Sequence, residues 1–324
     1  MTAKSLLNRY LNEVVKDYIP RARVAKLARK RANRVGRVLL NDPDMGAFDY
    51  DLSGSIAKAT GTLPLSDVDM LVYLSPSDWL NASGKLYAPS TVLRLMEERL
   101  EQTFRVHIDN RNNQIRRQTH SVGVLYGGQD SVNIDVVPAM CDDDDNDNDE
   151  RICWIPQRGS GRWLQTSVRR QLIALDQLDG PGTPLRRAIR ALKVWRNNFE
   201  VELHSYGIET IAMILVANKD APRSLSGIVR ATLDWLGDIP NQYAIWCTLF
   251  DHEDRAPGKY AACAFDPAIP ENNVLKGIKT PECKKIATQA RRSLKALDLA
   301  LECLAEGSLE EGRELTYEAL GCDL

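Results

Sequence analysis

Three aspartates in two apolar segments are the side chains best suited to chemistry. Asp67 and Asp69 open the apolar run 70–74, which predicts a β-strand. Because side chains alternate along a strand, both carboxylates point to the same face, about 7 Å apart. Asp135 lies in a second, β-branched segment, 131–138, that also predicts a strand. If the two strands pair, all three carboxylates meet.

Such a set of carboxylates indicates a site for divalent cations. Oxygen ligands favour Mg²⁺, or Mn²⁺ in its place, and leave room for substrate phosphates. Two ions about 3.5–4 Å apart serve an in-line displacement, in which one activates an attacking hydroxyl and the other clamps the departing pyrophosphate. We therefore predict two Mg²⁺ ions held by Asp67, Asp69 and Asp135, which would serve both as the metal ligands and as the catalytic residues of a nucleotidyl transfer.

A glycine and a serine precede these acids by a short loop. Gly54 would let the backbone approach a triphosphate closely, and the Ser55 hydroxyl could bind its oxygens. We therefore predict that both residues bind the nucleotide.

The order Gly-Ser, loop, Asp-x-Asp and distal aspartate resembles the polymerase-β-like nucleotidyltransferases. Thr60-Gly61-Thr62 ahead of Ser66-Asp67-Val68-Asp69 resembles the CD-NTases, bacterial enzymes related to cGAS and DncV. The resemblance implies an α+β fold: a catalytic lobe with a mixed sheet flanked by helices, a helical second lobe, and the active site in the cleft. It also implies synthesis of a cyclic di- or trinucleotide from NTPs, ATP among them, with pyrophosphate release. The setting would be bacterial anti-phage signalling of the CBASS type, with a separate effector that binds the product.

The second half of the chain carries a row of cations at helical spacing. Arg186, Arg190 and Lys193 fall at i, i+4 and i+7 and share one face of a predicted helix. That spacing suits a triphosphate, but a solvated basic face shows it as well. The segment 192–195 resembles the lysine-bearing helix of the family, which implies that Lys193 reaches the nucleotide phosphates.

Two further segments resemble nucleotide-binding parts of the family. Ser205 and Tyr206 open a predicted helix, and the resemblance implies that the serine touches phosphate and the tyrosine the base. A helix N-cap and a core tyrosine are the structural alternatives. The segment 265–274 resembles the Asp-Pro…Pro…Asn segment of the family, which makes Asp266 a candidate nucleotide contact. The alternative is a loop that only closes the fold.

The elements around these residues indicate two domains, a catalytic lobe at 1–165 and a helical lobe at 166–324. Residues 3–40 predict a long basic helix, kinked at Pro20, that braces the back of the catalytic sheet. Strands are also expected at 105–109, 115–117 and 121–126.

The composition is that of a globular protein, with 42 Lys and Arg against 44 Asp and Glu in 324 residues. Seven acids gather at 142–150, a run whose role the sequence leaves open. Seven cysteines without regular spacing indicate a reducing compartment and no zinc motif, so we expect no zinc-dependent binding of duplex DNA. No signal peptide and no apolar run of about 18 residues is present, so we expect a cytoplasmic protein without a membrane partner.

The sequence is also compatible with other functions. A different polymerase-β-like transferase would make a linear oligonucleotide or modify a protein, a tRNA or an antibiotic. A catalytically silent nucleotide sensor would retain its role when the aspartates are replaced. A template-directed enzyme or a nucleic-acid-binding protein is a third alternative, but the sequence contains no nucleic-acid recognition motif.

Overall fold

A computed structural model describes residues 1–324 except 108–113, 127–131, 142–149, 158–160, 181 and 240–259, so most of the acidic run lies outside the described residues. Contacts between Cα atoms group the chain into two compact units. Unit 1 comprises Met1–Ile19 and Ile173–Leu324, and unit 2 comprises Pro20–Leu172.

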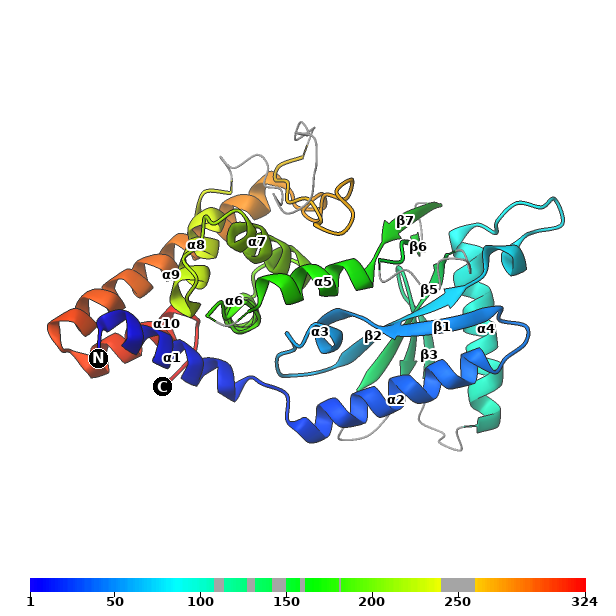
Figure 1. The fold of residues 1–324 in the computed structure, drawn as a ribbon, viewed down its shortest axis with the longest axis horizontal. Helices are drawn as coiled ribbons and strands as arrows, with labels where there is room; N and C mark the ends of the chain where they lie inside the picture. The colour runs from blue at the N-terminus through cyan, green and yellow to red at the C-terminus, as the bar shows by residue number, and fades with distance from the viewer. Residues whose placement is uncertain (108–113, 127–131, 142–149, 158–160, 181, 240–259) are drawn as a thin grey trace. The chain divides into compact units, whose positions relative to one another are not determined.

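Among its described residues, unit 2 contains a seven-stranded mixed sheet with the central order β1-β2-β5-β4-β3, and with β6 and β7 attached to β5 (Figure 1). Strands β2 and β5 run parallel, and the other pairs are antiparallel. The strands are β1 (Ala47–Leu52), β2 (Asp67–Leu74), β3 (Gln114–Arg117), β4 (Val122–Leu125), β5 (Asn133–Met140), β6 (Cys153–Gln157) and β7 (Arg162–Thr166).

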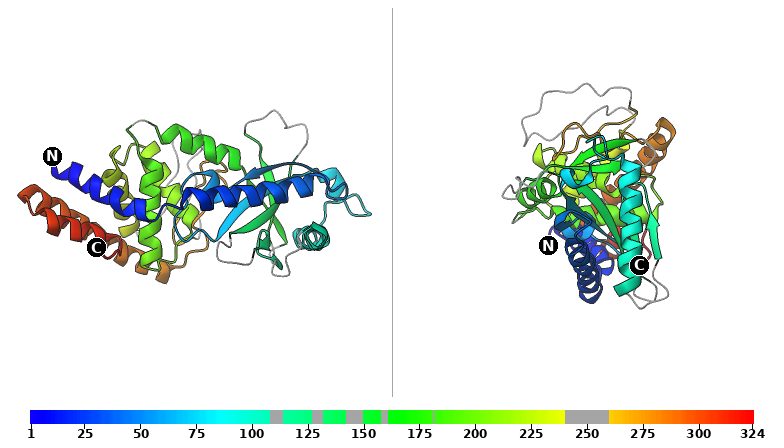
Figure 2. Two further views of the ribbon diagram at one scale, coloured as in Figure 1. Left: turned by 90° about the horizontal axis from the view of Figure 1, so that it is seen from below. Right: turned by 90° about the vertical axis from the view of Figure 1, so that its right-hand side faces the viewer.

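Two helices cover one face of this sheet. They are α2 (Ala22–Leu40) and α4 (Pro89–His107), and both contact strands of the sheet (Figures 1 and 2). Alternate residues of β2 and β5, such as Met70 and Val136, share a fully buried core with these helices. The remaining alternate residues, such as Leu71 and Val137, form a smaller apolar cluster on the opposite face. Burial of both faces explains why β2 reads as a continuous apolar run.

Two short elements complete unit 2. The helix α3 (Gly54–Ala57) lies between β1 and β2, and the 3₁₀ helix η1 (Pro76–Trp79) follows β2. At the start of α3, the Ser53 amide donates a hydrogen bond to the Asp69 carbonyl oxygen of β2 (2.8 Å). In η1, the Trp79 indole donates to the Met45 carbonyl oxygen in the loop before β1 (2.9 Å).

Unit 1 is helical in its described residues. Its helices are α1 (Ala3–Asp17), α6 (Leu185–Asn198), α7 (Ser205–Ala217), α8 (Leu225–Gly237), α9 (Thr280–Glu306) and α10 (Leu309–Ala319), and they bury one continuous apolar core. The helix α5 (Val168–Leu178) crosses the boundary between the two units. Within the parts of the chain that are described, no helix has the length and apolarity needed to cross a bilayer.

The α+β fold class is confirmed, as are the strands expected at 115–117 and 121–126, which are β3 and β4. The strand expected to begin at Arg105 is wrong, because α4 continues to His107. Leu100 and Phe104, four residues apart and both buried, carry the helical period through this region.

The basic N-terminal segment forms two helices with different surroundings. The helix α2 braces the sheet as predicted, whereas α1 packs against α6, α8, α9 and α10 in unit 1. The physical reason is the break at Pro20, after which the apolar stripe of each helix faces a different core. The domain ranges 1–165 and 166–324 stay a prediction.

Candidate active site

The parallel pairing of β2 with β5 brings the predicted acids together. Asp69 lies opposite Asp135 in the register, and Asp67 lies opposite Asn133. Paired residues in a sheet project to the same face, and so do residues two apart along one strand. All three carboxylates therefore lie on the face opposite α2 and α4, at the ends of β2 and β5 where both strands begin.

Neutral polar side chains orient two of the three carboxylates. Asp67 accepts hydrogen bonds from the Ser66 hydroxyl (2.6 Å) and from the Asn133 amide (3.4 Å). Asp135 Oδ1 accepts a hydrogen bond from the Gln118 amide (2.8 Å). None of these three partners adds a positive charge, so they leave the repulsion between the acids in place.

Sequence reasoning missed Gln118, which lies in the connection between β3 and β4. A signal was present in Gly123 of β4, since a glycine within a strand often marks a close approach. A Cβ at Gly123 would lie 3.1 Å from Gln118 Nε2 and 3.2 Å from Asp135 Oδ1. The glycine thus leaves room for the hydrogen bond between them.

The pKa of Asp135 shows how strongly the acids interact. Burial is the largest cause, and repulsion by Asp69 and then Asp67 adds to it, so the pKa of Asp135 rises from 3.8 to about 7. The hydrogen bond from Gln118 acts in the opposite direction. Near neutral pH, the Asp135 carboxyl can therefore both hold and release a proton.

Gly54 lies directly against Asp69. It opens α3 with a φ of +62°, a conformation that favours glycine. A Cβ at this position would lie 1.9 Å from Asp69 Oδ2, closer than any real contact. Ser55 follows in the same helix, and its carbonyl oxygen accepts from the Thr60 amide (2.9 Å). Gly54 and Asp69 are thus close neighbours.

The donor set fits a divalent cation by type but is not gathered around one. In the described part of the chain, no group of three Asp, Glu, His or Cys side chains is close enough to form a ready metal site. The hydrogen bonds from Ser66, Asn133 and Gln118 occupy oxygens of Asp67 and Asp135 that a cation would need as ligands. Carboxylate oxygens are the ligands that Mg²⁺ prefers, and Asp135 must lose its proton to bind the cation.

The remaining predicted site residues lie in unit 1. Lys193 is on α6, and its side chain is only 4% exposed. Its ammonium lies 2.5 Å from Oε1 of Glu209 on α7, a side chain that is 5% exposed. Sequence reasoning gave Glu209 no partner, although a carboxylate in the apolar run 208–216 is a signal of one. Arg186, from the same row of cations, pairs with Asp179 (2.8 Å).

Ser205, Tyr206 and Asp266 also have partners within unit 1. Ser205 is the first residue of α7, and its hydroxyl accepts a hydrogen bond from Arg196. The Tyr206 hydroxyl donates to Asp266 Oδ1 (2.7 Å), and Asp266 is 3% exposed. The structure therefore joins Tyr206 to Asp266, while Ser205, the neighbour of Tyr206 in the chain, bonds to Arg196.

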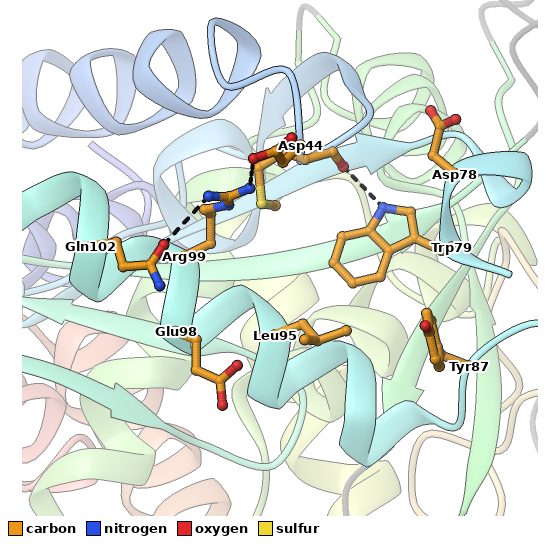
Figure 3. Close-up of a pocket in the computed structure, with 9 residues that line it drawn as sticks. Asp44, Asp78, Trp79, Tyr87, Leu95, Glu98, Arg99 and Gln102 are labelled. Carbon is orange, nitrogen blue, oxygen red and sulfur yellow. Dashed lines mark hydrogen bonds and ion pairs between the residues drawn. The ribbon is translucent and has the colours of Figure 1, made fainter. Parts of the chain in front are cut away.

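A separate hollow of about 340 Å³ in unit 2 is lined by three carboxylates, those of Asp44, Asp78 and Glu98. Figure 3 shows the ion pair between Arg99 and Asp44, one of its carboxylates. Glu98, a second carboxylate of the hollow, pairs with Arg94 (2.6 Å). These two acids already have cations of the chain as partners, and none of the predicted site residues lines the hollow.

Curated and solved proteins resemble most of the chain. A CBASS oligonucleotide cyclase, CdnC from Escherichia coli strain KTE188, is 25% identical over 270 residues, which cover 81% of this chain and 79% of that protein. Two structures of CdnC from E. coli MS115-1, one with ATP and one in a complex with HORMA-deltaN, match with a TM-score of 0.73 at 22% identity. Each match covers 97% of this chain, and 97% of CdnC in the ATP structure and 96% in the complex.

A more distant structure shares the same fold. The CD-NTase CdnG from Bradyrhizobium diazoefficiens, solved in complex with GTP, matches 97% of this chain and 98% of its own with a TM-score of 0.64 at 16% identity. The profile of Second Messenger Oligonucleotide or Dinucleotide Synthetase domains, or SMODS, matches residues 1–178, more than half of the chain. That range includes the three aspartates and the Gly-Ser pair, and the chain therefore belongs to the SMODS family of nucleotidyltransferases.

Proposed function

We propose that this chain joins NTPs, ATP among them, into a cyclic di- or trinucleotide and releases pyrophosphate. The family and the CBASS cyclases among the relatives support this activity, and the solved complex of CdnC with ATP supports an NTP substrate. The observation that carries the proposal is the pairing of Asp69 with Asp135 beside Gly54.

In this proposal Asp67, Asp69 and Asp135 hold two Mg²⁺ ions, or Mn²⁺ in their place. When bound, the cations would neutralise charge on the triphosphate and on the transition state. Gly54 would let the backbone come close to the triphosphate. A side chain at this position would also collide with Asp69. Ser55 offers a hydroxyl to the phosphate oxygens.

Asp135 is the proposed general base. Gln118 donates to its Oδ1, so we assign the proton transfer to Oδ2. Oδ2 takes the proton of the acceptor hydroxyl, whose oxygen then forms a bond to the α-phosphorus of the donor NTP. The bond from that phosphorus to the bridging oxygen breaks, and pyrophosphate leaves. A second transfer on the linear product would close the ring.

The residues of unit 1 would bind the nucleotide. Lys193 and Ser205 would contact phosphate, Tyr206 would stack on the base, and Asp266 would belong to the same pocket. The close pair with Glu209 means that Lys193 would reach a phosphate with that carboxylate still beside it.

The biological setting follows from the same relatives. We propose that the enzyme acts in the bacterial cytoplasm in anti-phage signalling of the CBASS type, and that a separate effector binds its product. The CBASS cyclases among its relatives support this setting.

The test is a product analysis. The purified chain is incubated with equimolar ATP, GTP, CTP and UTP and with Mg²⁺ or Mn²⁺, and products are identified by mass spectrometry. We expect a cyclic oligonucleotide and pyrophosphate. Asp69→Asn should abolish both, whereas Asp78→Asn, at an exposed acid of the same unit, should abolish neither. A linear product or a nucleotide adduct would identify another transferase, and full activity of Asp69→Asn would refute the proposal.

A further inference from the structure

The segment that carries Asp266 is closed by its own hydrogen bonds. Phe265 and Asn273 form an isolated β-bridge, and the Asp266 amide donates to the Asn272 carbonyl oxygen (2.9 Å). The side-chain oxygen of Asn273 accepts from the Ala264 amide (3.1 Å) and the Leu275 amide (2.9 Å). Asn273 thus stabilises the backbone around it, and the segment holds Asp266 in a fixed position.

The Asp266 carboxylate is directed at Tyr206. Its Oδ1 accepts from the Tyr206 hydroxyl (2.7 Å) and from the Ala268 amide (2.8 Å), while the residue is 3% exposed. A buried carboxylate depends on such donors, and losing one is costly. A direct bond from this oxygen to a base would have to displace them.

Tyr206 is fixed at its hydroxyl end by this bond. Burial, followed by the charge of Asp266, raises the pKa of Tyr206 well above its ordinary value, so the hydroxyl stays a donor. Its neighbour Ser205 accepts from Arg196. Two bonds to different parts of unit 1 therefore orient the first two side chains of α7.

We propose that Asp266 is a positioning residue that acts on bound nucleotide through Tyr206, by holding the phenol ring in the orientation in which a base stacks on it. The inference rests on the proposed stacking role of Tyr206. It assigns Asp266 a task different from reading the base, because the carboxylate is turned to the tyrosine. An aromatic ring can stack on every base, so loss of Asp266 should weaken the binding of all four NTPs to the same extent.

The experiment measures binding and turnover of each of the four NTPs by the full chain with Mg²⁺. Asp266→Ala should raise Kd and KM about 10- to 100-fold for every NTP, as expected for one lost hydrogen bond to a charged group, with a smaller effect on kcat. Asp266→Asn keeps an acceptor oxygen for Tyr206 and should recover most of this loss. Glu271→Ala, at an exposed acid of the same segment, is the matched control.

Coupling between the two residues gives a second measurement. Tyr206→Phe keeps the ring but not the donor, and adding it to Asp266→Ala should cause little further loss, because both changes remove the same bond. The inference is overturned if Asp266→Asn changes the relative affinities for the four bases, if it is as damaging as Asp266→Ala in a chain of normal Tm, or if the effects of the two changes add in full.

The two proposals fail in different ways. If the unaltered chain binds and cyclises NTPs but the Asp266 variants change the relative affinities for the four bases, only the positioning role is refuted. If the unaltered chain binds no NTP, the proposed function falls and the positioning role falls with it.

Discussion

A methyl group added at Gly54 tests whether the close approach of this residue to Asp69 matters for catalysis. In Gly54→Ala, the new Cβ would lie 1.9 Å from Asp69 Oδ2. Ordinary contact begins at 3.4 Å, so the two groups must separate by about 1.5 Å. A displacement of about 1 Å in a catalytic group can lower the rate about 100-fold. We therefore expect kcat to fall at least about 100-fold.

Gly84→Ala is the matched control, because Gly84 also has a positive φ, +74°, and also belongs to unit 2. No described atom lies within 4 Å of the position that its Cβ would take. Both substitutions carry the cost of a left-handed alanine, about 1–2 kcal/mol of stability. Only Gly54→Ala should also displace a carboxylate of the proposed active site.

The assay compares initial rates of pyrophosphate release with thermal unfolding for both variants. Similar losses in Tm and a large loss of kcat for Gly54→Ala alone are the expected result. The reasoning is refuted if Gly54→Ala retains a rate within a few-fold of Gly84→Ala at saturating Mg²⁺ and NTP.

Three further predictions concern charge. In metal-free protein the pKa of Asp135, about 7, lies above its ordinary value of 3.8, so the folded state keeps a proton that the unfolded state has lost. The free energy of unfolding should therefore fall between about pH 4 and 7. Asp69→Asn should reduce that fall by about 1 kcal/mol after allowance for solvent screening. The prediction is contradicted if the urea midpoint changes by the same amount between pH 5 and pH 8 in both proteins. Asp67→Asn should raise the Mg²⁺ concentration at half-maximal rate, and an unchanged Mg²⁺ titration would exclude Asp67 as a ligand. Glu209→Gln should destabilise the fold by about 3 kcal/mol in urea unfolding and Lys193→Met/Glu209→Leu by less, whereas equal losses would show that the buried pair is not the cause.

The acids could be predicted from the sequence because their signal is local. An apolar run after Asp67 and Asp69 predicts a strand, and alternation then fixes the face on which both side chains lie. The pairing with the strand of Asp135 needed a resemblance as well, because nothing local determines which strands become neighbours. The strand expected at 105–109 failed for a related reason, since a short apolar run fits a strand as well as the end of a helix.

The partners of the site residues could not be predicted in this way. Gln118 is 17 residues from Asp135, and Asp266 is 60 residues from Tyr206. A long-range hydrogen bond depends on how elements pack, and one polar residue has many potential partners at such separations. Glu209 is the exception, because a carboxylate in an apolar helix requires a cation nearby.

The acids of unit 2 and the predicted site residues of unit 1 have different charged surroundings, which suggests different roles in nucleotide binding. In unit 2, Asp67 and Asp135 accept hydrogen bonds from neutral side chains, which bring no positive charge to the acids. In unit 1 the cation of Lys193 faces Glu209, and the carboxylate of Asp266 faces a neutral phenol, while Arg196 bonds to Ser205. Two cations and two carboxylates there sum to no net charge. In the proposed function, neutralisation of a triphosphate would therefore depend on divalent cations taken up by the acids, and the residues of unit 1 would contribute orientation more than charge.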